Sequence, residues 1–155
     1  MTPTQTPHRY DVDAESTRGG AAQATTNGRT IRFDASATQA QDLPGPADLM
    51  TAAFAACILK NVERFSEILP FRYEHARIHV TSERQDAPPR MTRIRYVLTI
   101  VTDEDAQRVD LLHRNIKGHG TIYNTLAAVC DVDGAIHVLA TAQASAWHEH
   151  PTRAR

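Results

Sequence analysis

One long apolar segment, residues 46–68, constrains the fold of this chain more than any other feature. Pro46 favours the first helical position, Asp48 suits the positive end of the helix dipole, and Pro70 ends the helix. Between these residues apolar side chains recur every three or four positions, which predicts an amphipathic α-helix. The predicted stripe comprises Leu49, Ala52, Ala53, Ala56, Leu59, Val62 and Phe65. Its alanine-rich face is too apolar for the surface of a single chain, so we expect a second copy to cover it.

Short strand-like runs lie on both sides of this helix, separated by turn residues. They cover residues 8–16, 21–26, 29–36, 71–83, 91–102 and 135–142. Asn27-Gly28 favours a tight hairpin because both residues tolerate positive φ, whereas residues 84–90 predict a longer loop. Two shorter helices are predicted over residues 103–116 and 119–129, the first with acidic residues at its start and Lys117-Gly118 at its end. The chain is therefore expected to have an α+β fold.

The rest of the chain completes one predicted domain. Asp133-Gly134 is expected to form the turn before the last strand. We expect a single domain over residues 1–142, a usual length for one domain, followed by a tail over residues 143–155. Because the tail lacks periodicity, it is predicted to fray or to dock on a partner.

Charge and hydropathy exclude several function classes. With 17 basic and 18 acidic residues, the chain has no electrostatic footprint for nucleic acid or an anionic membrane. Its longest apolar run has eight residues, against roughly 20 for a membrane span, and its first residues lack the pattern of a signal peptide. We expect a cytoplasmic protein that binds neither nucleic acid nor membrane and needs no cofactor. No metal is expected either, since His75 with His79, and His148 with His150, do not complete a set of three ligands.

Two cysteines, Cys57 and Cys130, are too few and too far apart for a disulfide framework. Taken without further context, Cys57 is most simply interpreted as a small buried hydrophobe. The alanines around it favour close packing, but they also leave room for a substrate. Cys130, beside Val129, is predicted to be a packing residue.

The segment "GPADLMTAAFAAC" and the order of elements resemble the OsmC/Ohr family, the osmotically inducible and organic hydroperoxide resistance proteins. The resemblance covers roughly residues 8–140, and "HGTIYNTLA" supports it. It implies two β-sheet halves around a long central helix, in an intertwined homodimer with two active sites at the subunit interface. It also implies that Cys57 is the thiol that attacks a hydroperoxide.

The chain departs from the family pattern at three places. Gly120 stands where the family has a second cysteine, and Ala47 stands where it has a glutamate, with Asp48 next to it. The family's active-site arginine has no unique counterpart. Arg32 is the first choice, with Arg29 and Arg18 behind it.

Peroxide reduction needs a thiolate that attacks the O–O bond, and a nearby arginine commonly stabilises such a thiolate. Cys57 lies beyond the reach of the helix dipole, so Arg32, held by Asp48, is expected to supply the charge. Cys130 lies ten residues past Gly120, about 15 Å along a helix, and cannot simply replace the missing thiol. An external thiol reductant is therefore expected.

Two hypotheses from different classes follow. In the first, the chain is a thiol-dependent peroxidase of organic hydroperoxides, with Ala53, Phe54 and Tyr123 lining an apolar pocket. In the second, the same dimer binds a small apolar ligand at the subunit interface without turnover. The retained Cys57 favours the first hypothesis, and the residues at positions 47 and 120 favour the second. A purely structural role for the helix ranks third because it leaves the thiol unexplained.

Overall fold

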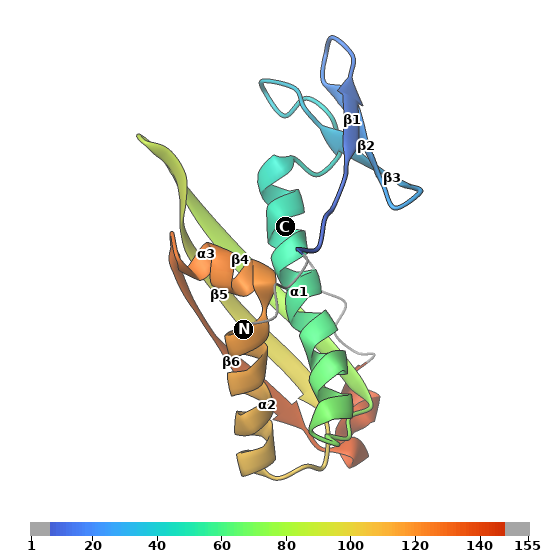
Figure 1. The fold of residues 1–155 in the computed structure, drawn as a ribbon, viewed down its shortest axis with the longest axis vertical. Coiled ribbons are helices and arrows are strands. Elements are labelled where there is room, and N and C mark those ends of the chain that lie inside the picture. The colour runs from blue at the N-terminus through green and yellow to red at the C-terminus, as the bar shows by residue number, and fades with distance from the viewer. Residues whose placement is uncertain (1–6, 148–155) are drawn as a thin grey trace, which may run out of the picture. The chain divides into compact units, whose positions relative to one another are not determined.

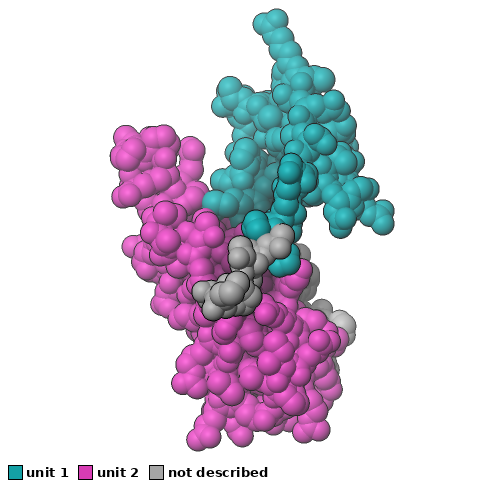
Figure 2. Space-filling model, viewed as in Figure 1, with its two compact units in different colours: residues 1–50 teal, residues 51–155 magenta. Residues whose placement is uncertain are grey.

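The computed structural model describes residues 7–147 of the chain. These residues belong to two compact units, residues 1–50 and residues 51–155, which Figure 2 shows in different colours. The unit boundary falls within the long helix α1 (Pro46–Ile68), whose bounds agree with the predicted helix. The fold is α+β, as predicted, with two three-stranded sheets.

The N-terminal unit is an antiparallel meander of β1 (Asp13–Ser16), β2 (Ala21–Thr26) and β3 (Arg29–Asp34). The predicted hairpin between β2 and β3 is confirmed, because Asn27 and Gly28 have φ values of 47° and 69°. Among the described residues of this unit, Ala22 is the one buried apolar residue. The meander therefore has almost no hydrophobic core of its own.

The C-terminal unit contains the second sheet, in the order β4-β5-β6. Its elements after α1 are β4 (His75–Asp86), β5 (Pro89–Val101), α2 (Ala106–His119), α3 (Thr121–Ala127), β6 (Asp131–Leu139) and the 3-10 helix η1 (Thr141–Trp147). β5 pairs with β4 antiparallel and with β6 parallel. A parallel pair needs a crossover connection, which α2 and α3 provide. Figure 1 shows α1 and α2 over one face of this sheet.

One face of β5 forms the centre of the core, as the alternation of its sequence predicts. The side chains of Ile94, Tyr96, Leu98 and Ile100 are at most 3% exposed. They pack with buried residues of α1, α2 and α3 in a single cluster. This cluster gives α1 a rigid support.

The single chain buries only part of the predicted apolar stripe of α1. Within the described chain the helix buries Phe54, Ile58, Asn61, Val62 and Phe65, and it leaves Ala52, Ala53 and Ala56 exposed. Large side chains gain more free energy from burial than alanine, so they set the orientation of the helix toward the sheet. The alanines occupy a separate, exposed face.

Three predicted boundaries also need correction. The loop expected at residues 84–90 is mostly strand, since Asp86 pairs with Pro89 across a two-residue turn. The helix expected from residue 103 begins at Ala106, and the Asp105 side chain accepts a hydrogen bond from the backbone N–H of Arg108 at 2.9 Å. β6 begins before Gly134, whose missing Cβ would lie 2.3 Å from the Tyr96 ring. Gly134 therefore serves close packing within a strand and not a turn.

The predicted tail can be assessed only in its first part. η1 includes residues 143–147, whereas residues 148–155, with His148 and His150, lie outside the described residues. No helix in the described part of the chain is long and apolar enough to cross a membrane.

Candidate functional site

Cys57 lies in α1, half-buried, one helical turn before Asn61. The Asn61 Nδ2 atom lies 3.1 Å from the Cys57 carbonyl oxygen and 3.7 Å from Cys57 Sγ, and it donates to both. Asn61 is only 7% exposed, so its amide is a buried polar group on the core side of the helix. Sequence reasoning did not single out Asn61. The sequence signal that could have identified Asn61 is a polar residue at a helical position that it shares with large apolar residues.

Gly120, which the resemblance predicts to align with a second cysteine of the family, lies beside Asn61. It caps the N-terminus of α3 with a φ of −75°, a value open to any residue. A Cβ at this position would lie 3.3 Å from Asn61 Nδ2, 2.9 Å from the Tyr123 Cβ and 3.0 Å from the Ile116 carbonyl oxygen. The absence of a side chain at Gly120 thus makes room for the Asn61 amide.

An aromatic cluster lies in the core next to these residues. The ring of Phe54 lies 5.8 Å from the rings of both Tyr96 and Tyr123, and the Tyr96 hydroxyl lies 2.7 Å from His113 Nε2. Burial raises the pKa of both tyrosines, so their phenols stay protonated at neutral pH. Burial, aided by Lys117, lowers the pKa of His113. Phe54 is fully buried and Tyr123 is 6% exposed, and their predicted role in binding substrate stays a prediction.

Cys130 has different surroundings. It follows α3, and its Sγ donates to the Leu126 carbonyl oxygen at 3.0 Å while its side chain packs against the core. Burial raises the pKa of the Cys130 thiol, and the Asp131 carboxylate raises it further. Both effects disfavour the thiolate, which agrees with the predicted packing role.

The predicted activating residues lie in the N-terminal unit. Arg32 is an exposed residue of β3 opposite Gln23, Arg29 begins the same strand, and Arg18 lies in the turn before β2. Cys57 belongs to the other unit. The activating role of Arg32 stays a prediction.

Asp48 stabilises the start of α1. Its Oδ2 atom accepts a hydrogen bond from the Gly45 backbone N–H at 2.9 Å. Its predicted role at Cys57, through Arg32, stays a prediction.

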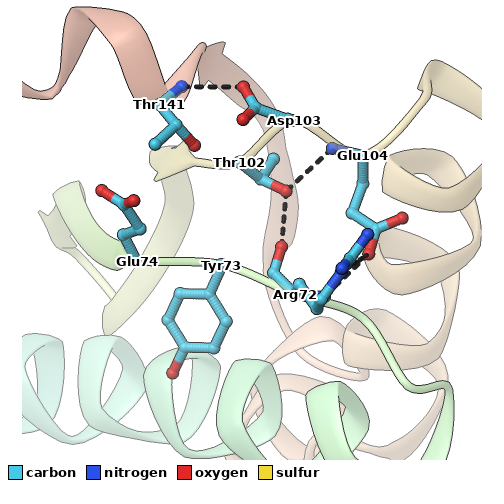
Figure 3. Close-up of a pocket in the computed structure, with 7 residues that line it drawn as sticks. All are labelled: Arg72, Tyr73, Glu74, Thr102, Asp103, Glu104 and Thr141. Atoms are coloured by element: carbon cyan, nitrogen blue, oxygen red, sulfur yellow. Dashed lines mark hydrogen bonds and ion pairs between the residues drawn. The ribbon is translucent and has the colours of Figure 1, made fainter.

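A polar pocket of about 310 Å³ lies elsewhere in the C-terminal unit (Figure 3). Its lining residues are Arg72, Tyr73, Glu74, Thr102, Asp103, Glu104 and Thr141. Asp103 accepts from the Thr141 backbone N–H at 2.9 Å, and Glu104 accepts from the Arg72 backbone N–H at 2.9 Å. Hydrogen bonds from these backbone groups lower the pKa of Asp103 and of Glu104. The carboxylates thus connect the segment after β5 to the segment before β4 and to η1, and we interpret the pocket as structural.

The comparisons identify the family. A sequence model of the OsmC-like protein family matches residues 38–133, more than half of the chain. The chain therefore belongs to the OsmC-like family, which confirms the resemblance seen in the sequence. No curated protein matches the chain.

Solved structures share the fold at low sequence identity. An OsmC-like protein from Mycoplasma pneumoniae is 17% identical, with a TM-score of 0.76 over 87% of this chain and 99% of that one. The organic hydroperoxide resistance protein OhrB of Bacillus subtilis is 18% identical, with a TM-score of 0.59 over 84% and 98%. An organic hydroperoxide resistance protein OsmC from Legionella pneumophila is 14% identical, with a TM-score of 0.66 over 86% and 100%. At these identities the likeness shows the fold alone.

Proposed function

We propose that the chain is a cytoplasmic, homodimeric peroxidase that reduces organic hydroperoxides through Cys57. The observation that carries the proposal is the Cys57 thiol, half-buried on the helix of the family segment, with an amide donor at its sulfur. The names of the solved structures from Bacillus subtilis and Legionella pneumophila point to the same substrate class.

In the first proposed step, the Cys57 thiolate attacks one peroxide oxygen and the O–O bond breaks. Sulfur is oxidised to a sulfenic acid, the peroxide is reduced, and the departing alkoxide takes a proton to leave as an alcohol. Arg32, oriented by Asp48, would stabilise the thiolate. Ala53, Phe54 and Tyr123 would accept the apolar part of the substrate.

In the second step, an external thiol reduces the sulfenic acid. One thiol forms a mixed disulfide with Cys57 and releases water, and a second thiol then breaks that disulfide and restores the free cysteine. An external source is proposed because Gly120 offers no thiol and because the thiolate of Cys130 is disfavoured.

The dimer is proposed from the exposed face of α1. Ala52, Ala53 and Ala56 are exposed in the single chain, and small residues allow two backbones to approach closely. A second copy on this face would remove apolar surface from water and would enclose the space next to Cys57.

The alternative is a dimer that binds a small apolar ligand without turnover. Gly120 and Ala47, which replace the family's second cysteine and its glutamate, favour this alternative. The two functions differ in what happens to the thiol. A ligand that only binds would leave Cys57 reduced.

The test is stopped-flow oxidation of the wild type, Cys57→Ser and Cys130→Ser by cumene hydroperoxide and by hydrogen peroxide, with a trap for sulfenic acid. We expect rapid oxidation and a trapped sulfenic acid in the wild type and in Cys130→Ser, and neither in Cys57→Ser. Oxidation no faster than that of free cysteine in all three proteins would exclude the peroxidase and leave the binding protein.

A further inference from the structure

We propose that Asn61 is a catalytic residue that donates a hydrogen bond to the Cys57 sulfur from its position beside Gly120. This inference rests on the proposed role of Cys57 as a reactive thiol. It adds to that role a group within the C-terminal unit that stabilises the thiolate, independent of any arginine in the other unit.

The orientation of the amide is fixed by its neighbour. A backbone carbonyl only accepts hydrogen bonds, so the atom that faces the Cys57 carbonyl at 3.1 Å must be the nitrogen of Asn61 and not its oxygen. The same nitrogen lies 3.7 Å from Cys57 Sγ. Its two N–H groups thus have two acceptors, one main-chain oxygen and one sulfur.

Burial strengthens the contact between Asn61 Nδ2 and Cys57 Sγ. Asn61 is 7% exposed and lies between Ile58 and Val62, which are fully buried. A buried polar group is costly unless it is hydrogen-bonded, and water competes little for an amide in such a position. A sulfur that carries negative charge is a better acceptor than a thiol, so the contact strengthens when Cys57 ionises.

Gly120 provides the space in which the Asn61 amide lies. A Cβ there would lie 3.3 Å from Asn61 Nδ2, closer than ordinary van der Waals contact. With any other residue at this position, either the Asn61 amide or the new side chain would have to shift to relieve the close contact. Gly120 thus leaves space that the Asn61 amide fills.

Asn115 provides a natural comparison within the same unit. Its Nδ2 atom donates to the carbonyl of the residue four positions earlier, Leu111, at 2.8 Å. This bond is the α2 counterpart of the Asn61 bond to the Cys57 carbonyl, but its acceptor belongs to a leucine and not to a cysteine. Asn115 is therefore the control for the purely structural role of a helical asparagine.

The test measures the alkylation of each cysteine by iodoacetamide at pH 7 in the full-length protein, using mass spectrometry of the two cysteine peptides. Asn61→Leu removes the donor, Asn61→Asp keeps the size of the side chain but replaces the donor with a carboxylate, and Asn115→Leu is the control. Cys130 serves as an internal reference in every sample. The rate of Cys57 oxidation by cumene hydroperoxide is measured in parallel.

We expect Asn61→Leu to slow the alkylation of Cys57 roughly tenfold, the scale of a hydrogen bond to a charged group, and Asn61→Asp to slow it further. The rate at Cys130 should stay within twofold in both variants, and Asn115→Leu should change neither rate. An unchanged rate at Cys57 in Asn61→Leu would overturn the proposal. If Asn61→Leu does not fold, an unchanged rate in Asn61→Asp would overturn it equally.

The two readouts separate this proposal from the proposed function. Slower alkylation in the Asn61 variants, together with no peroxide reduction by the wild type, would support the role of Asn61 and reject the peroxidase. Peroxide reduction by the wild type, with both rates at Cys57 unchanged in the Asn61 variants, would retain the peroxidase and reject the role of Asn61.

Discussion

The surroundings of the two cysteines have opposite polarity. Both sulfurs are half-buried, and each has a hydrogen-bond partner four positions away along the chain. At Cys57 the partner is an amide that donates to the sulfur, whereas at Cys130 it is a carbonyl that accepts from it. Cys130 also has a carboxylate next to it, that of Asp131.

Under the proposed function, this difference would separate a reactive thiol, Cys57, from an unreactive one, Cys130, of the same burial class. A donor favours the charged form of a sulfur, while an acceptor and a nearby negative charge favour the neutral form. Only the charged form is nucleophilic. Exposure alone would have ranked the two cysteines equally.

The largest expected effect concerns the charge that the proposed function assigns to Arg32. Free cysteine is only a few per cent thiolate near pH 7, so loss of a group that keeps the thiolate fully formed can slow oxidation by roughly thirtyfold. Arg32→Leu should approach this limit in a stopped-flow assay with cumene hydroperoxide and should bring Cys57 closer to Cys130 in reactivity. Arg29→Leu, on the opposite face of β3, is the comparison, since Arg29 is the second candidate for this role. Equal rates in Arg29→Leu and Arg32→Leu would show that Arg32 has no special role.

The second prediction concerns Gly120, which lies beside Asn61, the hydrogen-bond donor to Cys57. Gly120→Ala would place a Cβ 2.9 Å from the Tyr123 Cβ and 3.0 Å from the Ile116 carbonyl, so neighbours must shift. We expect the free energy of unfolding to fall by about 1–3 kcal/mol, as measured by urea denaturation, and Cys57 alkylation to slow severalfold.

Gly118→Ala is the control for this change, because a Cβ at Gly118 meets no atom within 4 Å. It should leave both quantities unchanged or slightly raise stability, since alanine favours a helix. Equal stability of the two variants would mean that the space at Gly120 is not tight.

The third prediction acts on the Cys130 region. Asp131→Asn removes the carboxylate that helps to raise the pKa of Cys130, although burial, the larger cause, remains. Alkylation of Cys130 at pH 8 should rise about threefold, while that of Cys57 stays constant. Asp133→Asn, a neighbouring substitution on β6, is the control. A matching rise in that variant would point to general loosening of the strand.

The smallest effect concerns pH and the aromatic cluster beside Cys57. Because burial lowers the pKa of His113 in the folded protein, the unfolded chain binds the proton more readily. Stability is therefore fully present above pH 6.5 and falls as the pH drops below it, by less than about 1 kcal/mol because water screens the half-exposed ring.

The measurement for His113 is urea denaturation at pH 7.5 and at pH 5.5 of the wild type and of His113→Gln. The loss of stability between the two pH values should be smaller in the variant. The same loss in both proteins would assign the pH dependence to other groups.

Local sequence signals predicted much of the fold. The bounds of α1 follow from Pro46 and its helical spacing, and the β2–β3 hairpin follows from Asn27-Gly28. Both signals act over a few residues, so their outcome depends little on the rest of the chain. The face of α1 that the single chain buries depends on side-chain size as well as on spacing, so spacing alone did not separate it from the alanine face.

The candidate site could be predicted only in part. Cys57 was found from the family motif, but Asn61 was not, because a polar residue on a helix gives no sign of where its amide points. The proximity of Asn61 to Gly120 joins α1 to α3 and depends on tertiary packing. Gly134 is a similar case. The sequence predicts a turn there, but the residue lies within β6 because the Tyr96 ring occupies the space that a side chain would need.

The separation in sequence between Asn61 and Gly120 has a consequence for the biosynthesis of the protein. Asn61 is local to Cys57, so one turn of helix is enough to bring the donor to the sulfur. Gly120 lies between α2 and α3, and Tyr96 and Tyr123 belong to β5 and α3, so they reach α1 only through long-range contacts, which form more slowly. Under the proposed role of Asn61, the amide would act on the sulfur only once this packing has buried it. A newly made chain would then be less readily oxidised at Cys57 than a mature one.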